Sequence, residues 1–387
     1  METEDKTGNK NSKGELFDLF ADWLIKALQR RHDENSPFKL FLVWFRRAIL
    51  ACNIFYLTFL IFYSACIEIL GQRWWLTAVA TYLPQNIWLI PLFFITLVNL
   101  YFYRRLLILS AIYLLIWFFF TSKFNLGFSK NIEGEKIVVL TNNIGQDNKE
   151  SLSPFLKAQN PDIVLLQEAS SRGRQFTNSF PEFRHSQIGE FAILTKYKIL
   201  TATNITLPDK PYRILGARFE IDFKSNRVAI YNIHIPSPRT DLHRVFGLRL
   251  FAGLVGIFYK NGRFENIRSE FDQSWQQRNI MYEHLISVLK NEELPFIASG
   301  DFNIPNYGPI YREFTQIALD SFKECGIGWG YTFPGDTRNP ISLFGPWLRI
   351  DYIFAGKGFS PVSVSTEPKR RSQHRAVATC LAFNSPK

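Results

Sequence analysis

The chain has 387 residues, enough for two or three folding units, and a formal net charge of +11. Its hydrophobic content of 47%, with 16% aromatic residues, excludes a chain too polar to build a core. Four cysteines form no disulfide framework, because Cys52 and Cys66 lie inside an apolar stretch and Cys325 and Cys380 follow no known spacing. Whether Cys325 and Cys380 form a disulfide is not determined by the sequence.

The first 45 residues are predicted to form a cytoplasmic amphipathic segment. Ser12 and Glu15 have the spacing of a capping box, and apolar residues at 16, 20, 23, 24 and 27 follow helical spacing. Such a helix could lie on a membrane surface, and an ordinary soluble helix fits the pattern nearly as well. A cleaved signal peptide is not expected, since the apolar stretch begins too late.

Residues 46–121 hold most of the apolar excess and are predicted to form a transmembrane region of about three helices. The expected spans are residues 48–70, 87–103 and 106–120. Each would cross the hydrocarbon core of a bilayer, which is about 30 Å thick. Tryptophan and tyrosine near their ends favour a membrane over the alternative, a buried hairpin of a soluble protein.

Basic residues beside the spans predict their orientation. Several precede the first span, and Arg104 and Arg105 join the second to the third, whereas the intervening loop offers only Arg73. The N-terminus is therefore expected in the cytoplasm, and everything after residue 121 outside it, in a multi-pass protein of the cell (inner) membrane. Because many basic residues flank spans, the positive charge is weak support for nucleic-acid binding.

After a linker at 122–135, residues 136–387 are predicted to form a soluble α/β domain. Short apolar runs alternate with amphipathic segments, and several runs are apolar on both faces, as layered sheets covered by helices require. The predicted strands are 136–142, 162–167, 191–195, 214–223, 227–235, 295–300, 348–356 and 376–383, and the predicted helices are 151–161 and 273–291.

Polar side chains gather where these strands end. They are Asn143, Gln167, Glu168, Asn232, His234, Asp301, Asn303, Asp351, Gln373 and His374. Strand ends at one sheet edge place side chains in one cleft, and carboxylates, amides and imidazoles without a thiol suit a hard cation such as Mg²⁺ and a phosphate ester. Each has a simpler reading alone: a turn for Asp301 and Asn303, or a core histidine for His234. Together they favour a site.

Six motifs, in order LTNNIG, LLQE, YNIHI, SGDFN, RIDYIF and SQHRAV, resemble those of the endonuclease/exonuclease/phosphatase superfamily, which includes DNase I-like nucleases. The resemblance covers roughly residues 136–384 and implies a four-layer α/β/β/α sandwich. Three spans before such a domain further resemble a membrane-anchored bacterial subgroup, some of whose members are linked to glycopeptide-antibiotic resistance.

The resemblance implies a role for each matching residue. Glu168 is expected to be the principal ligand of Mg²⁺, or of Mn²⁺, with Asn143 beside it at the metal or the substrate. Asp301 is expected to hold and deprotonate the attacking water, and Asn303 to donate a hydrogen bond to the phosphoryl oxygens.

Three further residues are expected to act on the substrate. His234 and Asn232 should contact the phosphate ester, and His374, polarised by Asp351, should stabilise the phosphate or transfer a proton. Gln373 departs from the family pattern, which usually has aspartate there, so a weaker or different metal preference is expected.

The insert at residues 239–271 mixes bulky apolar and basic residues. It is either a flap that dips into the outer leaflet or an ordinary helix that covers the sheet. The sequence thus predicts a membrane-anchored, Mg²⁺-dependent phosphodiesterase or phosphatase that uses water as nucleophile on a phosphate ester, lipid-linked in the favoured version. The alternatives are an extracytoplasmic nuclease and a catalytically impaired membrane module.

Overall fold

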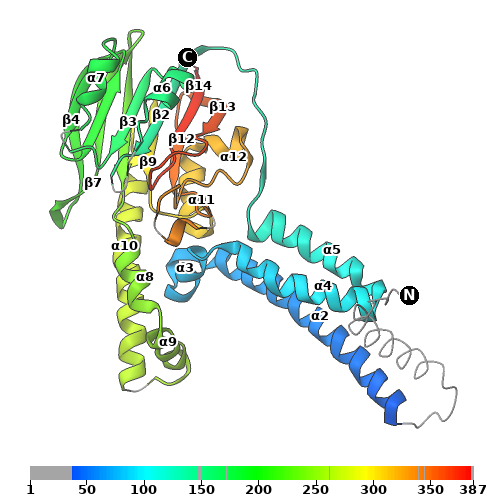
Figure 1. Ribbon diagram of the computed structural model, residues 1–387. Coiled ribbons are helices and arrows are strands. Elements are labelled where there is room, and N and C mark those ends of the chain that lie inside the picture. Colours follow the sequence, from blue (N-terminus) through cyan, green and yellow to red (C-terminus); the bar gives the residue numbers. More distant parts are fainter. Residues whose placement is uncertain are drawn as a thin grey trace, which may run out of the picture.

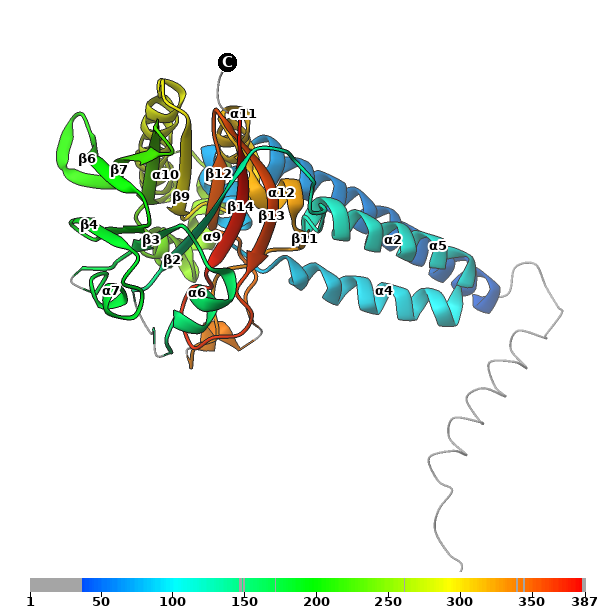
Figure 2. The ribbon, with the colours of Figure 1, turned by 90° about the horizontal axis from the view of Figure 1, so that it is seen from above.

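The computed structural model describes residues 37–384, except 146, 147, 149, 171, 261, 339 and 344. The amphipathic helix predicted between Ser12 and Arg31 lies outside this part of the chain. Within it, apolar helices lead into a domain built on two packed sheets (Figure 1; Figure 2).

Three apolar helices precede the sheets, as predicted. They are α2 (Pro37–Ile69), α4 (Leu89–Phe102) and α5 (Leu107–Ile116). Short 3₁₀ and π segments extend the last two, so that Gln85–Phe102 and Arg104–Thr121 are, like α2, long and apolar enough to cross a membrane. Bulky apolar side chains such as Phe55 and Phe62 are exposed on their outer surface, where lipid would cover them.

Buried polar side chains join these helices. Asn53 of α2 and Asn99 of α4 exchange two hydrogen bonds, with Nδ2 to Oδ1 distances of 3.0 and 2.9 Å. Asn99 also donates to Ser110 Oγ of α5 at 3.2 Å, and the Tyr113 hydroxyl donates to Asn53 Oδ1 at 3.0 Å. Because buried amide and hydroxyl groups need hydrogen-bond partners, these pairings select which helix faces meet.

Replacing Asn99 by leucine should lower the free energy of unfolding of the full chain in detergent by about 1–2 kcal/mol, because Asn53 and Ser110 lose their partner. Titration with a denaturing detergent measures the change. The double variant Asn53→Leu/Asn99→Leu should recover part of the loss, since no unpaired amide remains. A stability of Asn99→Leu equal to that of the parent would argue against the pairing.

The remaining chain forms two six-stranded mixed sheets, with strand orders β10-β12-β9-β8-β7-β6 and β13-β14-β2-β3-β5-β4. The first contains β6 (Lys198–Leu207), β7 (Lys210–Phe223), β8 (Asn226–His234), β9 (Phe296–Asp301), β10 (Leu319–Asp320) and β12 (Asp351–Ala355). The second contains β2 (Glu135–Asn143), β3 (Ile163–Gln167), β4 (Arg184–Ile188), β5 (Phe191–Thr195), β13 (Phe359–Thr366) and β14 (Val377–Phe383). Only β8–β9 and β2–β3 are parallel pairs among these strands.

The sheets pack face to face, and helices cover both outer faces. Residues such as Val139, Ile230 and Ile297 fill the core between the sheets. The helices α10 (Arg263–Lys290) and α11 (Gly308–Ile317) cover the first sheet, and α6 (Ser153–Gln159) and α7 (Gln175–Ser179) cover the second. The predicted four-layer sandwich is confirmed. All eight predicted strands are present, but the edge strands β4, β6, β10 and β13 were missed, and all four cysteines are free.

The ends of the apolar helices nearest the sheets pack directly on the domain. Glu68, near the end of α2, forms ion pairs with Arg312 of α11 at 3.0 Å and with Lys123 at 2.9 Å. Gly71 and Gly308 touch through their backbones, and a Cβ at Gly308 would lie 2.8 Å from the Gly71 Cα, so neither position has room for a side chain. In the predicted linker, β1 (Asn125–Leu126) pairs with β11 (Ile327–Gly328).

The segment between α2 and α4 shares a core with the domain. It contains the short helix α3 (Trp75–Thr81), from which Trp75 and Val79 are buried against Phe271 and Trp275 of α10. The same cluster includes residues of α8 (Arg239–Val245) and α9 (Leu248–Phe258), which together with the beginning of α10 form the predicted insert at 239–271. The apolar helices and the sheet domain therefore form one packed unit at this junction.

Candidate active site

Strand register brings the predicted residues together at one end of the sheets. His234 at the end of β8 is the cross-strand partner of Asp301 at the end of β9, and Asp301 is the partner of Asp351 at the start of β12. In the other sheet, Asn143 ends β2 and Glu168 directly follows the neighbouring strand β3. Because the sheets pack face to face, both sets of side chains meet.

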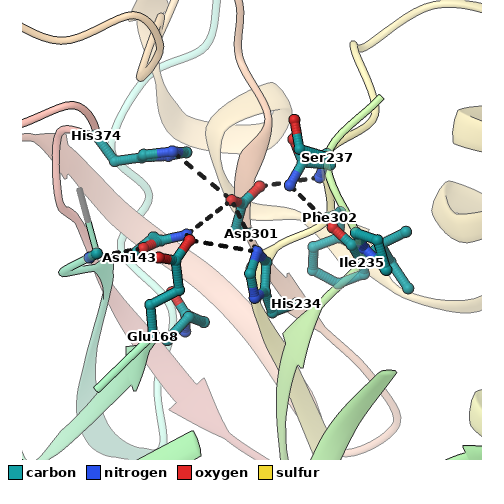
Figure 3. A network of polar contacts seen from close by, with 12 residues as sticks. Asn143, Glu168, His234, Ile235, Ser237, Asp301, Phe302 and His374 are labelled. Carbon is teal, nitrogen blue, oxygen red and sulfur yellow. Dashed lines mark hydrogen bonds and ion pairs between the residues drawn. The ribbon is translucent and has the colours of Figure 1, made fainter. Parts of the chain in front are cut away.

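Asp301 lies at the centre of the resulting polar network (Figure 3). Its Oδ2 accepts a 3.1 Å hydrogen bond from Asn143 Nδ2 and lies 3.8 Å from the Nε2 atoms of His234 and His374. Asn143 Nδ2 also donates to Glu168 Oε1 at 3.1 Å. Side chains from three separate strand ends and loops therefore converge on one carboxylate, and Asn143 links it to Glu168.

Burial and neighbouring charges set the protonation of this network. Burial raises the pKa of Asp301 to about 6, although the opposite charge of His374 opposes the shift. Burial acts to lower the pKa of His374, but Asp351, 3.0 Å from Nδ1, and Asp301 outweigh it and raise the pKa to about 9. His374 is therefore an imidazolium at neutral pH, held between two carboxylates.

Glu168 has a left-handed backbone conformation with φ of +49°, which side-chain-bearing residues seldom adopt. Its carboxylate lies next to Gly145, where a Cβ would come within 2.0 Å of Glu168 Oε2. Arg172 donates to the Glu168 carbonyl oxygen at 2.7 Å and supports this turn. Only glycine at position 145 leaves room for the carboxylate.

Glu190 is a member of the network that sequence reasoning missed. Its Oε1 lies 2.9 Å from His234 Nδ1. Burial acts to lower the pKa of His234, but Glu190 and Asp301 outweigh it and raise the pKa. Glu190 stands in the turn between β4 and β5, where an acidic residue after Gly189 is ordinary turn chemistry, so no pattern in the sequence singled it out.

Asn232 does not line the cleft. Its Nδ2 donates to the carbonyl oxygens of Leu166 and Ala192, both at 3.0 Å, and its Oδ1 accepts from Gln167 Nε2 at 2.6 Å. The side chain is fully buried and joins β8 to the opposite sheet. With its amide used in this way, Asn232 holds the sheets together, which corrects the expected contact with substrate.

Asn303 is held by hydrogen bonds from the sheet domain and from the segment between two apolar helices. Its backbone N–H donates to Asp301 Oδ1 at 3.0 Å, and its Nδ2 donates to the Ile235 carbonyl at 2.9 Å. Its second amide N–H has no partner among the described residues. Its carbonyl accepts hydrogen bonds from the hydroxyls of Tyr82 at 2.7 Å and Tyr282 at 2.9 Å. Tyr82 lies between α2 and α4, so the segment joining two apolar helices braces this loop.

The network forms the floor of a cleft of about 420 Å³. The apolar walls are formed by Tyr82, Leu242, Phe246, Phe333, Trp347, Leu348 and Ile350. Among the described residues that line the cleft, Arg239 is the only lysine or arginine. The cleft therefore has a charged floor and a largely apolar body.

The sequence profile of the Endonuclease/Exonuclease/phosphatase family matches residues 124–374, which include the whole network. The chain belongs to this family. Enzymes of the endonuclease/exonuclease/phosphatase family are metal-dependent hydrolases of phosphate esters, so family membership confirms the predicted enzyme class.

Solved structures that resemble this family member are distant from it in sequence. A Bacteroides thetaiotaomicron protein of the family has 16% identity and a TM-score of 0.45, covering 65% of this chain and 100% of that one. A Neisseria 3′ phosphatase bound to a product DNA hairpin has 15% identity and a TM-score of 0.42, covering 64% and 99%. Truncated Caenorhabditis elegans TDP2 has 19% identity and a TM-score of 0.39, covering 64% and 97%. No curated protein matches the chain.

Family members generally use divalent metal ions, and two groups of side chains could hold one here. The first is the Glu168 carboxylate, 34% exposed, with the amide of Asn143. The second is Asp301, Asp351 and His374, whose ligand atoms lie within 4.8 Å of one another. In the second group the imidazole is engaged with a carboxylate at Nδ1 and faces another at Nε2, which suits a proton carrier, so the oxygen ligands of the first group fit a hard cation better.

Proposed function

We propose that this protein is a membrane-anchored, Mg²⁺-dependent phosphoesterase that hydrolyses a lipid-linked phosphate. The cleft carries the proposal, because it joins a floor of carboxylates and imidazoles to apolar walls. A phosphoryl group would lie against the floor while its apolar chain is removed from water along the walls. The floor addresses only the phosphoryl group, so the proposal covers monoesters and diesters alike.

The network supplies the groups for in-line attack by water, with no covalent enzyme intermediate. Asp301, with a pKa of about 6, would orient the water and accept its proton. His374, kept charged by Asp351, would donate a hydrogen bond to the phosphate, or a proton to the leaving oxygen as its bond to phosphorus breaks, and His234 would donate a hydrogen bond from the other side. The unused N–H of Asn303 would donate to a phosphoryl oxygen.

Glu168, with Asn143 beside it, would hold the Mg²⁺ ion, and Mn²⁺ would suit the same oxygen ligands. When bound, the ion would supply positive charge to the phosphoryl oxygens. Asn143 spends both of its amide N–H groups on Glu168 and Asp301, so it would set the separation between the metal ligand and the base. That positioning role adds to the role expected from the resemblance.

Hydrolysis by the full chain in lipid nanodiscs tests the proposed function. The substrates are a prenyl phosphate, a soluble phosphate ester and DNA, and phosphate release is followed with Mg²⁺ and with a chelator. We expect Mg²⁺-dependent release, fastest from the prenyl phosphate. Faster cleavage of DNA, with a rate that falls steeply as salt rises, would favour the nuclease alternative. Arg239, the one arginine among the described residues of the cleft, offers little positive charge for binding DNA. No hydrolysis of any substrate would favour an impaired module.

The proposed location is the cell membrane, with the N-terminus in the cytoplasm and the cleft outside it. The apolar helices support membrane association, and the asymmetry of basic residues around them supports this orientation. Protease added to spheroplasts, whose inner membrane is intact and exposed, should cleave the sheet domain, whereas cleavage only after lysis of the spheroplasts would reverse the orientation.

Replacing Glu168 by glutamine should weaken Mg²⁺ binding by at least about tenfold, because the ligand loses its negative charge. Calorimetry on the full chain in detergent measures the dissociation constant. Glu283→Gln, an exposed acid on α10, is the matched control and should bind Mg²⁺ as the parent does. An unchanged affinity in Glu168→Gln would assign the metal to other side chains.

Replacing Gln373 by aspartate should tighten Mg²⁺ binding by about tenfold, because it adds a carboxylate to the lining of the cleft. Gln373→Asn keeps the side chain neutral and serves as the control. If Gln373→Asp binds Mg²⁺ no better than the parent, the missing aspartate is not what sets the metal affinity of this chain.

A further inference from the structure

The helix α9 has one face packed on the domain and another face exposed. Its buried positions are Gly253 and Gly256, which lie against Phe271 and Phe264 of α10. On the opposite side Leu248, Phe251 and Phe258 are 90%, 67% and 88% exposed. Their spacing of three and seven residues places them in one stripe along the helix.

This apolar stripe is too concentrated to be ordinary surface. Single exposed apolar residues are common on soluble proteins, but three bulky ones on one short helix, continued by exposed Phe246 and Tyr259 at its two ends, mark a contact surface. Among the described residues, nothing in the structure covers the stripe.

The position of α9 identifies what covers it. In Figure 1 the sheets lie above, while α9 and the apolar helices α2 and α4 both extend below them. The packed face of α9, with Leu250 and Leu254, belongs to the same hydrophobic cluster as α3, which lies between α2 and α4. In this cluster the ring centroids of Trp75 of α3 and Phe271 of α10 are 5.0 Å apart. The helix that carries the stripe therefore packs beside the segment that joins two of the proposed spans.

Basic residues flank the stripe. Arg244 precedes α9, and Lys260 and Arg263 follow it, all three exposed. Arg249 lies on the helix and pairs with Glu270 at 2.5 Å. Apolar side chains flanked by lysine and arginine match the interface of an anionic bilayer, where the chains enter the acyl region and the cations stay among the headgroups.

We propose that the α9 stripe inserts into the leaflet of the bilayer that faces the sheet domain. Phe246 belongs both to the exposed surface and to the lining of the cleft, so the inserted helix would lead a lipid-linked phosphate from the leaflet into the cleft. The inference rests on the proposed function, because it takes the three helices as spans and the substrate as a lipid.

A depth measurement tests insertion without any use of activity. The full chain carrying Phe251→Cys is labelled with a bimane fluorophore and placed in nanodiscs that contain nitroxide-labelled lipids. The control is Tyr212→Cys, an 80% exposed site on the β6–β7 hairpin, which lies across the sheets from the spans in Figure 2. The parent chain, labelled in parallel, corrects for native cysteines.

The fluorophore at 251 should be quenched by the lipid nitroxide and protected from aqueous iodide, whereas the one at 212 should behave in the opposite way. Equal accessibility to iodide at both positions would overturn the proposal. Protection from iodide without quenching by lipid would also overturn it, since a second copy or another protein would then cover the stripe.

The second measurement links the stripe to turnover. The variant Leu248→Ser/Phe251→Ser/Phe258→Ser changes exposed side chains only, so the fold should persist. Its kcat/KM should fall about tenfold on a prenyl phosphate in nanodiscs and stay unchanged on a soluble ester. A tenfold loss corresponds to the free energy of burying about one apolar side chain. Equal loss on both substrates would refute the delivery role. Absence of all hydrolysis, with quenching at 251 intact, would instead refute the proposed function.

Discussion

Replacing Asp301 by asparagine should lower the turnover number for any phosphate ester by about 10²–10⁴-fold, the contribution of a well-placed general base. Asparagine keeps an oxygen for the backbone N–H of Asn303 but cannot accept the proton of the attacking water. Initial rates of phosphate release at saturating substrate measure the effect.

The matched control is Asp272→Asn, because Asp272 is an aspartate outside the cleft that pairs with Arg268 at 2.7 Å. It should retain the parent rate. The thermal midpoint of both variants shows whether folding is intact. If a folded Asp301→Asn protein keeps a rate within a few-fold of the parent, then Asp301 is not the base.

Removing the apolar helices should damage the active site as well as the membrane anchor. A chain that begins at residue 122 loses Tyr82, which donates to the Asn303 carbonyl, and uncovers Phe271, Trp275 and Ile350. We expect kcat/KM on a soluble phosphate ester to fall by about 10²-fold, the loss that a displacement of about 1 Å in a catalytic group brings. Rates are compared with those of the full chain in detergent.

Full-length Tyr82→Phe isolates the hydrogen bond from the packing. It should lose about 1 kcal/mol of stability and retain more activity than the truncated chain. A fragment from residue 122 that is as active and as thermostable as the full chain would show that the helices anchor the enzyme without shaping its site. That result would leave the roles of Asp301 and His374 untouched.

The four edge strands are the part of the two sheets that the sequence analysis did not predict. Every predicted strand, from 136–142 to 376–383, carries a run of apolar residues because it is covered on both faces by helices or by the other sheet. The missed strands β4, β6, β10 and β13 lie at the four sheet edges. Polar residues make up most of β4 and half of β6, β10 has only two residues, and β13 contains Pro361 next to a bulge. These features protect an edge from pairing with another chain.

The sequence alone determined the three apolar helices, the layered α/β domain and the residues expected at its site, because burial shows as hydrophobic periodicity and the site residues lie in ordered motifs. Asn143, Glu168, His234, Asp301 and His374 meet as their motifs predicted.

Only the tertiary structure decided the roles of Glu190, Asn232 and Tyr82. Each acts through a partner distant in the sequence: Glu190 on His234, Asn232 on the opposite sheet, and Tyr82 on Asn303. Such contacts depend on strand register and on how the apolar helices pack on the sheets, and neither leaves a local pattern in a single sequence.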